Sequence, residues 1–213
     1  MTYIFYLILN LIATVVCYVT NPIVVLFATE LGELKGFLKY WQTWDDSLDP
    51  RFFVMEKVPK IFRYDYDKHY TEYEGTTPEL EAVGRMRWFV KFVEGGENFS
   101  IKERIQRYFC RVFWLTRNNS YGFSFWLFGR TINPKDMIWN NVSNDTKFGY
   151  DKSESFITRA WTYKSEAKIF SWVRWEIYLG WKISEDSQTI QQCMIANRIA
   201  IRFIKDWMKT WNK

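Results

Sequence analysis

Histidine and cysteine are scarce in this sequence of 213 residues. It holds one histidine, His69, and three cysteines, Cys17, Cys110 and Cys193, without regular spacing. A structural zinc site takes its histidine and cysteine ligands from closely spaced pairs, and a secreted disulfide scaffold uses an even number of closely spaced cysteines. The sequence also lacks glycine-rich phosphate loops, the nucleophile elbow and the His-Glu-x-x-His motif. We therefore predict no catalytic residue, no metal and no cofactor.

Charge is missing from the N-terminal segment that runs from Tyr3 to Ala28. About 20 apolar residues in a helix span the hydrocarbon core of a bilayer, so residues 1–28 are predicted to form a membrane anchor. No Lys or Arg precedes the segment, unlike in a signal peptide. Pro22 predicts a kink or an end near Thr20, because proline has no backbone donor. We favour a spanning (transmembrane) helix over a monotopic helix in one leaflet, and both interpretations stay open.

Asn10 and Cys17 lie inside this anchor. Hydrocarbon offers no water to the Asn10 amide. The amide therefore bonds to a second helix, which favours self-association, or to its own backbone, or it stays shallow in a tilted helix. The sequence leaves a homo-oligomer open.

Positive charge follows the anchor, at Lys35, Lys39 and Arg51. The positive-inside rule then predicts a single-pass protein whose C-terminal domain is cytoplasmic. Within a juxtamembrane region, residues 29–50, the stretch from Leu31 to Tyr40 alternates apolar and charged residues, which is typical of an amphipathic segment at a membrane surface. A surface helix that packs on its own domain is the alternative. The expected interfacial residues are Lys35, Lys39, Trp41 and Trp44.

Residues 51–213 are predicted to form an α+β domain of helices packed on an antiparallel sheet. Thr77 and Pro78 predict a helix start, with the helix running toward Val93. A capping box of Ser100 and Glu103 predicts a second helix, through Arg117. The expected apolar face of that helix comprises Ile101, Ile105, Tyr108, Val112 and Leu115.

Strand patterns dominate the rest of the chain. A strand is expected to begin at Tyr121, and two antiparallel strands are expected over Phe156 to Tyr163 and Lys168 to Ile183. Residues 132–149, rich in Asn and Asp, predict a polar loop. Residues 187–211 alternate like a strand, but their length without Gly or Pro favours a helix.

Three arginines at helical spacing, Arg104, Arg107 and Arg111, form the best candidate for anion binding. Guanidinium groups suit phosphates, and the net charge of +5 suits an anionic partner. A solvated face, or pairing with acids of the preceding loops, is the alternative. The anchor places an anionic lipid ahead of nucleic acid, which we do not expect as a partner.

Asp45, Asp49 and His69 are a weaker candidate for an acidic site. Carboxylates and a histidine support acid–base chemistry when a fold gathers them. Aspartates before a proline are also ordinary turn residues, and a lone histidine in a charged loop is ordinarily solvated.

Several blocks of the sequence resemble a known family. They are Gly36-Phe-Leu-Lys-Tyr-Trp-Gln-Thr-Trp-Asp45, Arg111-Val-Phe-Trp-Leu-Thr-Arg-Asn-Asn-Ser-Tyr-Gly-Phe123 and Leu179-Gly-Trp-Lys182. With the uncharged start and Asn21-Pro22, they resemble an uncharacterised family of small membrane-associated proteins of tailed bacteriophages and prophages. The resemblance implies a setting, the inner membrane of a bacterial host, and no mechanism.

We therefore expect a phage-encoded, membrane-anchored, non-enzymatic protein. Its cytoplasmic domain is expected to bind a host or phage protein, in host takeover, exclusion or counter-defence. One alternative is an enzyme acting on a lipid or another membrane-bound substrate, and another is a virion or assembly component. The absence of nucleophile and metal motifs favours the first hypothesis.

Overall fold

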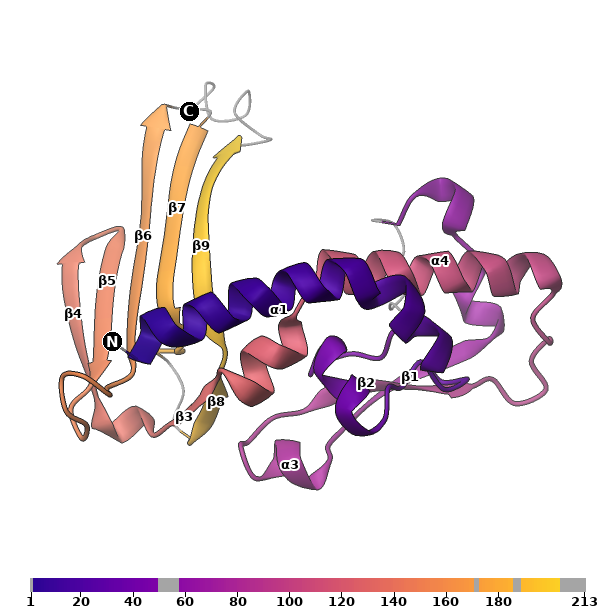
Figure 1. Ribbon diagram of the computed structural model, residues 1–213, viewed down its shortest axis with the longest axis horizontal. Coiled ribbons are helices and arrows are strands. Elements are labelled where there is room, and N and C mark those ends of the chain that lie inside the picture. Colours follow the sequence, from indigo (N-terminus) through magenta and orange to yellow (C-terminus); the bar gives the residue numbers. More distant parts are fainter. Residues whose placement is uncertain (1, 50–57, 171–172, 186–188, 204–213) are drawn as a thin grey trace. The chain divides into compact units, whose positions relative to one another are not determined.

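A computed structural model describes residues 2–49, 58–170, 173–185 and 189–203. The expected α+β class is confirmed, because one long apolar helix at the N-terminus is followed by shorter helices and antiparallel sheets (Figure 1). Parts of the expectations above lie outside the described ranges, namely Arg51 and residues 171–172, 187–188 and 204–211.

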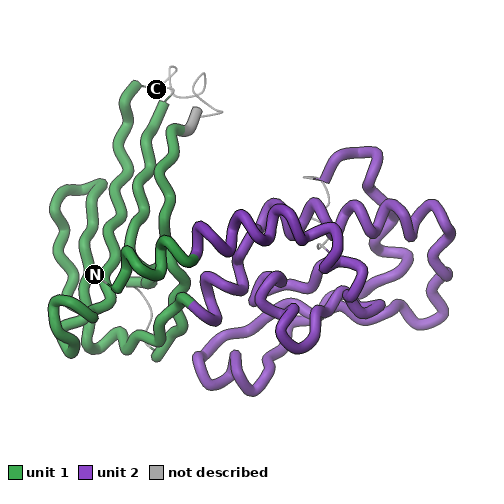
Figure 2. Tube along the Cα trace, viewed as in Figure 1, with its two compact units in different colours: residues 1–9, 128–213 green, residues 10–127 purple. Residues whose placement is uncertain are grey.

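The chain divides into two compact units (Figure 2). Unit 1 comprises residues 1–9 and 128–213, and unit 2 comprises residues 10–127. The division made from composition, at residues 28 and 50, follows the end of the apolar segment and the end of the acidic turn. The division by packing instead assigns the beginning of the N-terminal helix to one unit and the rest of it to the other.

Helix α1 spans Thr2–Val24 and passes into a 3-10 turn at Val25–Phe27. The helix does not end near Thr20, since it continues through Pro22 to Val24. Proline removes one backbone donor, and near a helix end this loss is small. The neighbouring Asn21 is fixed from outside the helix, because its Nδ2 donates to Asn119 Oδ1 at 3.2 Å.

Unit 2 contains helix α4, Ile101–Arg117, whose start and end are confirmed. Ser100 Oγ accepts from the Glu103 backbone N–H, and the Glu103 carboxylate accepts from the Ser100 N–H at 2.9 Å. This reciprocal capping box satisfies two backbone donors that the first turn leaves without helical partners. Asn118 caps the C-terminal end.

The segment before α4 departs from expectation. Thr77 does cap a helix, α3, but that helix spans only Pro78–Glu81. The continuation toward Val93 is wrong, because β2, Arg87–Phe92, pairs antiparallel with β1, Tyr70–Gly75. The run Trp-Phe-Val inside β2 has high strand propensity, and tertiary pairing overrides the helix start. Unit 2 also holds 3-10 helices at Gly36–Trp41, Lys60–Phe62 and Tyr66–Lys68.

The stretch Phe123–Leu127 is a π-helical turn and not the expected start of a strand. Its aromatic side chains pack in two directions within unit 2: Phe123 meets Trp41 edge-on at 4.8 Å, and Phe125 stacks on Trp44 at 4.6 Å. A strand would place residues 123 and 125 on the same face. The helical backbone directs the two rings to different sides, where each packs against a different tryptophan.

Unit 1 contains a five-stranded antiparallel sheet in the order β4-β5-β6-β7-β9. The strands are β4 (Met137–Ser143), β5 (Thr146–Asp151), β6 (Trp161–Phe170), β7 (Val173–Trp181) and β9 (Ile195–Phe203). Two short strands, β3 (Arg130–Ile132) and β8 (Gln191–Cys193), pair separately, and a 3-10 turn spans Pro134–Asp136.

Two expectations for unit 1 are wrong and one is confirmed in part. The polar loop over residues 132–149 is largely the β4–β5 hairpin, and in the described part of residues 187–211 the favoured helix is replaced by β8 and β9. In both stretches cross-strand pairing overrides the local signals of composition and length. The antiparallel pair expected over residues 156–163 and 168–183 exists as β6 and β7, but β6 continues through residues 164–166 to Phe170, and β7 begins at Val173.

The core of unit 1 is built around Trp181, which is fully buried. Tyr3, at the start of α1, meets Trp161 and Trp181 edge-on at 4.9 and 5.5 Å. Gly180 has a φ of +90°, and a Cβ there would lie 2.1 Å from the carbonyl oxygen of Trp161. Only glycine allows this approach of the two strands. The core also holds Ile132, Ala160, Ile183, Cys193 and Ile195.

Candidate functional site

Helix α1 has one buried side and one exposed side. Its buried residues recur every three, four or seven positions, the spacing of one helix face: Tyr3, Asn10, Ala13, Cys17, Asn21 and Val24. The exposed side is almost wholly apolar, with Val19 at 72% of its full accessibility. The other large exposed side chains include Ile4, Ile8, Leu11, Ile12, Val15, Ile23 and Leu26, together with Phe27 just beyond the helix. We call these residues the outer face of α1.

The part of α1 that belongs to unit 2 is fastened by polar contacts. Ser124 Oγ donates to Asn10 Oδ1 at 2.7 Å, and the Thr14 and Ser120 hydroxyls lie 2.8 Å apart. Asn119 Nδ2 donates to the Thr14 carbonyl at 2.6 Å. The chain itself thus supplies the partner of the Asn10 amide for which a second helix was considered. These contacts, with that of Asn21, make a polar seam on the buried side of the helix.

The end of α1 in unit 2 is joined to the segment that carries Lys35 and Lys39. Trp41 Nε1 donates to Thr20 Oγ1 at 2.8 Å, and Phe37 packs edge-on against Trp41. Lys35, Phe37 and Lys39 are exposed, whereas Trp41 is buried. Of the four residues expected at the interface, the two lysines lie at the surface, and Trp41 and Trp44 pack within unit 2.

The candidate arginines on α4 have different environments. Arg111 is buried and contacts both carboxylate oxygens of Asp49, from Nε at 2.9 Å and from Nη2 at 2.6 Å. Burial by itself raises the pKa of Asp49, but the charges of Arg111 and Arg107 and the hydrogen bonds to the carboxylate together outweigh it, and the pKa lies below its usual value. Tyr64 OH donates to the same carboxylate at 3.2 Å. Gly32, at φ +70°, presses against it, because a Cβ there would lie 2.9 Å from Asp49 Oδ2.

Arg107 is buried too, and its partners come from two loops. Its Nη2 lies 3.0 Å from Glu30 Oε2, and its guanidinium covers the Phe99 ring at 4.3 Å. Arg104 is exposed, and its Nε donates to the Phe99 carbonyl at 3.3 Å. Pairing with acids of the preceding loops therefore accounts for Arg107 and Arg111, and Arg104 is the one member of the stripe at the surface.

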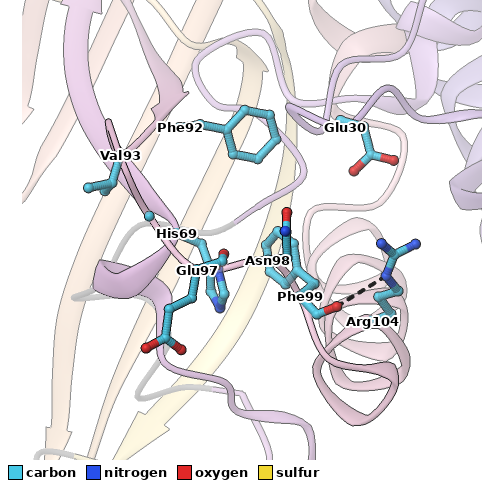
Figure 3. A pocket seen from close by; sticks show the side chains of 9 residues that line it. Glu30, His69, Phe92, Val93, Glu97, Asn98, Phe99 and Arg104 are labelled. Carbon is cyan, nitrogen blue, oxygen red and sulfur yellow. Dashed lines mark hydrogen bonds between the residues drawn. The ribbon is translucent and has the colours of Figure 1, made fainter.

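Two hollows flank these arginines and share Glu30 and Arg104. The first measures about 200 Å³ and adjoins the end of α1; its lining comprises Val25, Leu26, Glu30, Arg104, Arg107, Tyr108 and Arg111. The second measures about 350 Å³. Figure 3 shows Glu30 and Arg104 on one side of this second hollow and His69 on the other.

His69 is buried and held on both ring nitrogens. Its Nδ1 lies 2.9 Å from the Glu97 carbonyl oxygen, its Nε2 lies 3.4 Å from Glu103 Oε1, and its ring stacks on Phe99 at 3.9 Å. Asp45 and Asp49 do not line the hollow that His69 lines. The three residues of the acidic candidate are therefore not gathered there. Among the described residues, no group of three or more His, Cys, Asp or Glu could hold a metal ion.

A third hollow, of about 560 Å³, is apolar and lies beside the first half of α4. Ile101 and Ile105 line it, and Ile101 is 80% accessible. The expected apolar face of the helix is thus covered only in part, with Leu115 fully buried. The remaining lining residues are Ile61, Phe62, Lys102, Gln106 and Phe109.

Sequence reasoning missed Glu30 and Phe99 as partners of Arg107, and Tyr64 as a partner of Asp49. Asp49 and Arg111 are 62 positions apart, and no local pattern announces such a pair. One signal was readable: Glu30 is the first charged residue after the apolar segment. In the structure, this residue at the end of the apolar segment pairs with Arg107 of α4.

Comparison with known proteins defines the family and no more. By length and composition, the helix over Thr2–Phe27 is able to cross a membrane, a test that signal sequences and some core helices also pass. No curated protein and no solved structure matches the chain. A family model does match, over residues 1–207. The chain belongs to that family, DUF7338, which is a family of unknown function.

Proposed function

We propose that this is a phage-encoded, non-enzymatic protein that sits on the inner membrane of a bacterial host and presents a domain to a host or phage protein. The outer face of α1 carries the proposal. A row of large apolar side chains that no described part of the chain covers is far larger than the scattered apolar residues of an ordinary surface. Burial in lipid is the simplest way to remove it from water.

The polar seam favours a monotopic helix over the single-pass helix expected from sequence. A spanning helix places its middle turns in hydrocarbon on every side, where polar groups are costly. Asn10, Thr14 and Asn21 instead bond to residues 119–124, which carry further polar groups with them. A helix lying in one leaflet keeps this seam on the protein side and gives the lipid only the outer face.

The residues around the end of α1 suit the same arrangement. Lys35 and Lys39 flank the exposed Phe37. A phenyl ring at the acyl boundary with lysines reaching toward phosphates is typical of interfacial segments. We place the domain on the cytoplasmic side, where anionic lipid attracts such lysines.

An apolar patch on the sheet of unit 1 supports a protein partner. Trp175 of β7 and its neighbour Ile201 of β9 are exposed, as is Ile199. The opposite face is polar, with Arg198 and Glu176 3.4 Å apart. Strand β9 also forms one edge of the sheet. Exposed edges and apolar sheet faces are surfaces on which a partner chain adds a strand or packs.

The membrane proposal is tested by measuring depth along the outer face. Single cysteines replace Ile4, Ile8, Val15, Val19 or Leu26, each is labelled with a fluorophore, and lipids with quenchers at known depths are added. The native cysteines are buried, so the unaltered protein serves as the labelling control. A monotopic helix predicts that all five labels lie about 5–10 Å below the headgroup boundary.

A spanning helix predicts a different depth profile. The labels would pass from one interface through the midplane to the other, over about 33 Å at 1.5 Å per residue. That profile would reject the monotopic arrangement and keep the anchor. Labels that no lipid quencher reaches would reject membrane binding.

The partner proposal is tested by capture of the full-length, tagged protein from infected cells. We expect Ile199→Asp to lose a partner that Arg198→Gln, on the polar face of the same strand, retains. Equal recovery in both variants would reject the sheet patch as the binding surface. Recovery of the protein in purified virions would favour an assembly component.

A further inference from the structure

The hollow at the end of α1 is surrounded by more positive than negative charge. Among the residues that the structure describes, three guanidinium groups line it, and Glu30 is the one acid in its lining. The carboxylate of Asp49 neutralises Arg111 from the buried side. Glu30 therefore faces Arg104 and Arg107 together, which leaves one positive charge in excess among the described residues of this hollow.

Glu30 occupies the place of an exchangeable anion. Its side chain is 74% accessible although its partner Arg107 is buried, at 10%. Hydrogen bonding to Arg107 holds the pKa of Glu30 below its usual value, with further contributions from the charges of Arg111 and Arg104. An exposed carboxylate on a buried guanidinium is easily replaced by another oxyanion, because it loses little burial when it swings into water.

Arg104 adds the second half of an anion site. Its Nε is fixed on the Phe99 carbonyl. Among the described residues, no acidic side chain forms an ion pair with Arg104. The guanidinium groups of Arg107, which is buried, and Arg104, which is at the surface, lie one helical turn apart on α4. Paired guanidinium groups of this kind bind phosphate.

The position of the hollow selects the source of the phosphate. Leu26, an outer-face residue of α1 that is 69% accessible, lines the same hollow as Arg104 and Arg107. If the outer face lies in the acyl region, the hollow opens at the level of the lipid phosphates. We infer that Arg104 and Arg107 bind the phosphate of an anionic lipid headgroup in this hollow, displacing the carboxylate of Glu30. The inference rests on the proposed membrane function.

Vesicle flotation with the full-length protein tests it. One set of vesicles contains phosphatidylcholine alone, and in the other phosphatidylglycerol replaces part of it. Arg104→Gln should weaken binding to the mixed vesicles about fivefold, the effect of one charge near an anionic surface. The matched control Lys102→Gln removes the same charge from the same helix, at a residue that lines the apolar hollow instead.

Glu30→Gln should increase lipid binding. Misfolding of the variant could not produce such an increase. The variant should strengthen binding to the mixed vesicles more than Glu81→Gln does, because Glu81 is exposed on α3, away from the arginines. Both variants change net charge equally, so a difference between them reports the hollow.

The outcomes separate the inference from the function on which it rests. Equal binding to both kinds of vesicle, unchanged by Arg104→Gln, overturns the headgroup site and leaves membrane binding intact. No flotation with either kind overturns both. Titration of inorganic phosphate into the protein in neutral detergent is the last arm. Phosphate binding that depends on Arg104, without preference for anionic vesicles, would assign the hollow to free phosphate and overturn the lipid source.

Discussion

Helices α1 and α4 both bury side chains that their compositions would place at the surface, and both expose side chains of the kind expected in a core. Helix α1 is apolar, yet it buries Asn10 and Asn21 and exposes Val19 and its neighbours. Helix α4 is rich in charge, yet it buries Arg107 and Arg111 and exposes Ile101 and Ile105. The difference teaches that burial here follows the supply of hydrogen-bond partners. Each of these buried polar groups has a partner, as buried polar groups require.

The largest expected effect comes from breaking the buried pair on α4. Arg111→Met leaves the Asp49 carboxylate buried without its cation, which costs about 3–5 kcal/mol of the free energy of unfolding. The measurement is urea unfolding of the full chain in mild detergent. Arg104→Met is the control, since its side chain is exposed, and should change stability by less than about 0.5 kcal/mol. Equal losses in the two variants would contradict the comparison.

Acid should break the same pair by protonation. The folded pKa of Asp49 is lowered, and that of Glu103 is lowered to about 2, mainly by the hydrogen bonds from Ser100. A lowered carboxyl pKa stabilises the fold above the unfolded pKa of about 4, and that stability is lost as the pH falls through the folded pKa.

The free energy of unfolding should therefore decline from about pH 5 to about pH 2. Glu103→Gln should make that decline shallower, because one carboxyl group with a lowered pKa no longer takes up a proton. An unchanged slope would show that Glu103 does not contribute.

The polar seam of α1 should come next in size. Asn21→Leu removes the amide that donates to Asn119 and places an apolar group on a polar seam, at a cost of about 1–3 kcal/mol. Val19→Leu, on the outer face of the same helix, should be nearly neutral. If Asn21→Leu is also neutral, the seam does not hold α1 to unit 2.

The capping box of α4 should give a smaller effect. Ser100→Ala removes the acceptor of the Glu103 backbone N–H and should cost about 1 kcal/mol. Ser100→Asp retains an acceptor at the cap and should recover most of that loss. Thermal unfolding of the three proteins side by side measures it.

The smallest effect on stability, and the sharpest contrast in binding, should come from the two exposed apolar surfaces. Val19→Lys and Ile105→Lys both alter exposed side chains and should each change stability by less than about 0.5 kcal/mol. Only Val19→Lys should release the protein from neutral vesicles, because it places a charge in the acyl region. Release by both would extend the membrane face to α4.

Features set by neighbouring residues were readable from the sequence. The apolar run of α1, the Thr77 cap and the Ser100–Glu103 box are local patterns whose physics acts within one helical turn. The candidate stripe of Arg104, Arg107 and Arg111 was readable for the same reason. Local patterns failed where a distant strand decided the outcome, as for β2, the β4–β5 hairpin and β9. There, cross-strand pairs outweighed helix starts and polar composition.

The sequence by itself determined that a long uncharged helix begins this protein and that three arginines share one side of a capped helix. Only the tertiary structure decided which side of each helix faces inward. It did so by placing Ser124 against Asn10 and Asp49 against Arg111, contacts that span 114 and 62 positions. The physical reason is that a buried amide or guanidinium is stable only where a partner is already held, and the fold as a whole positions that partner.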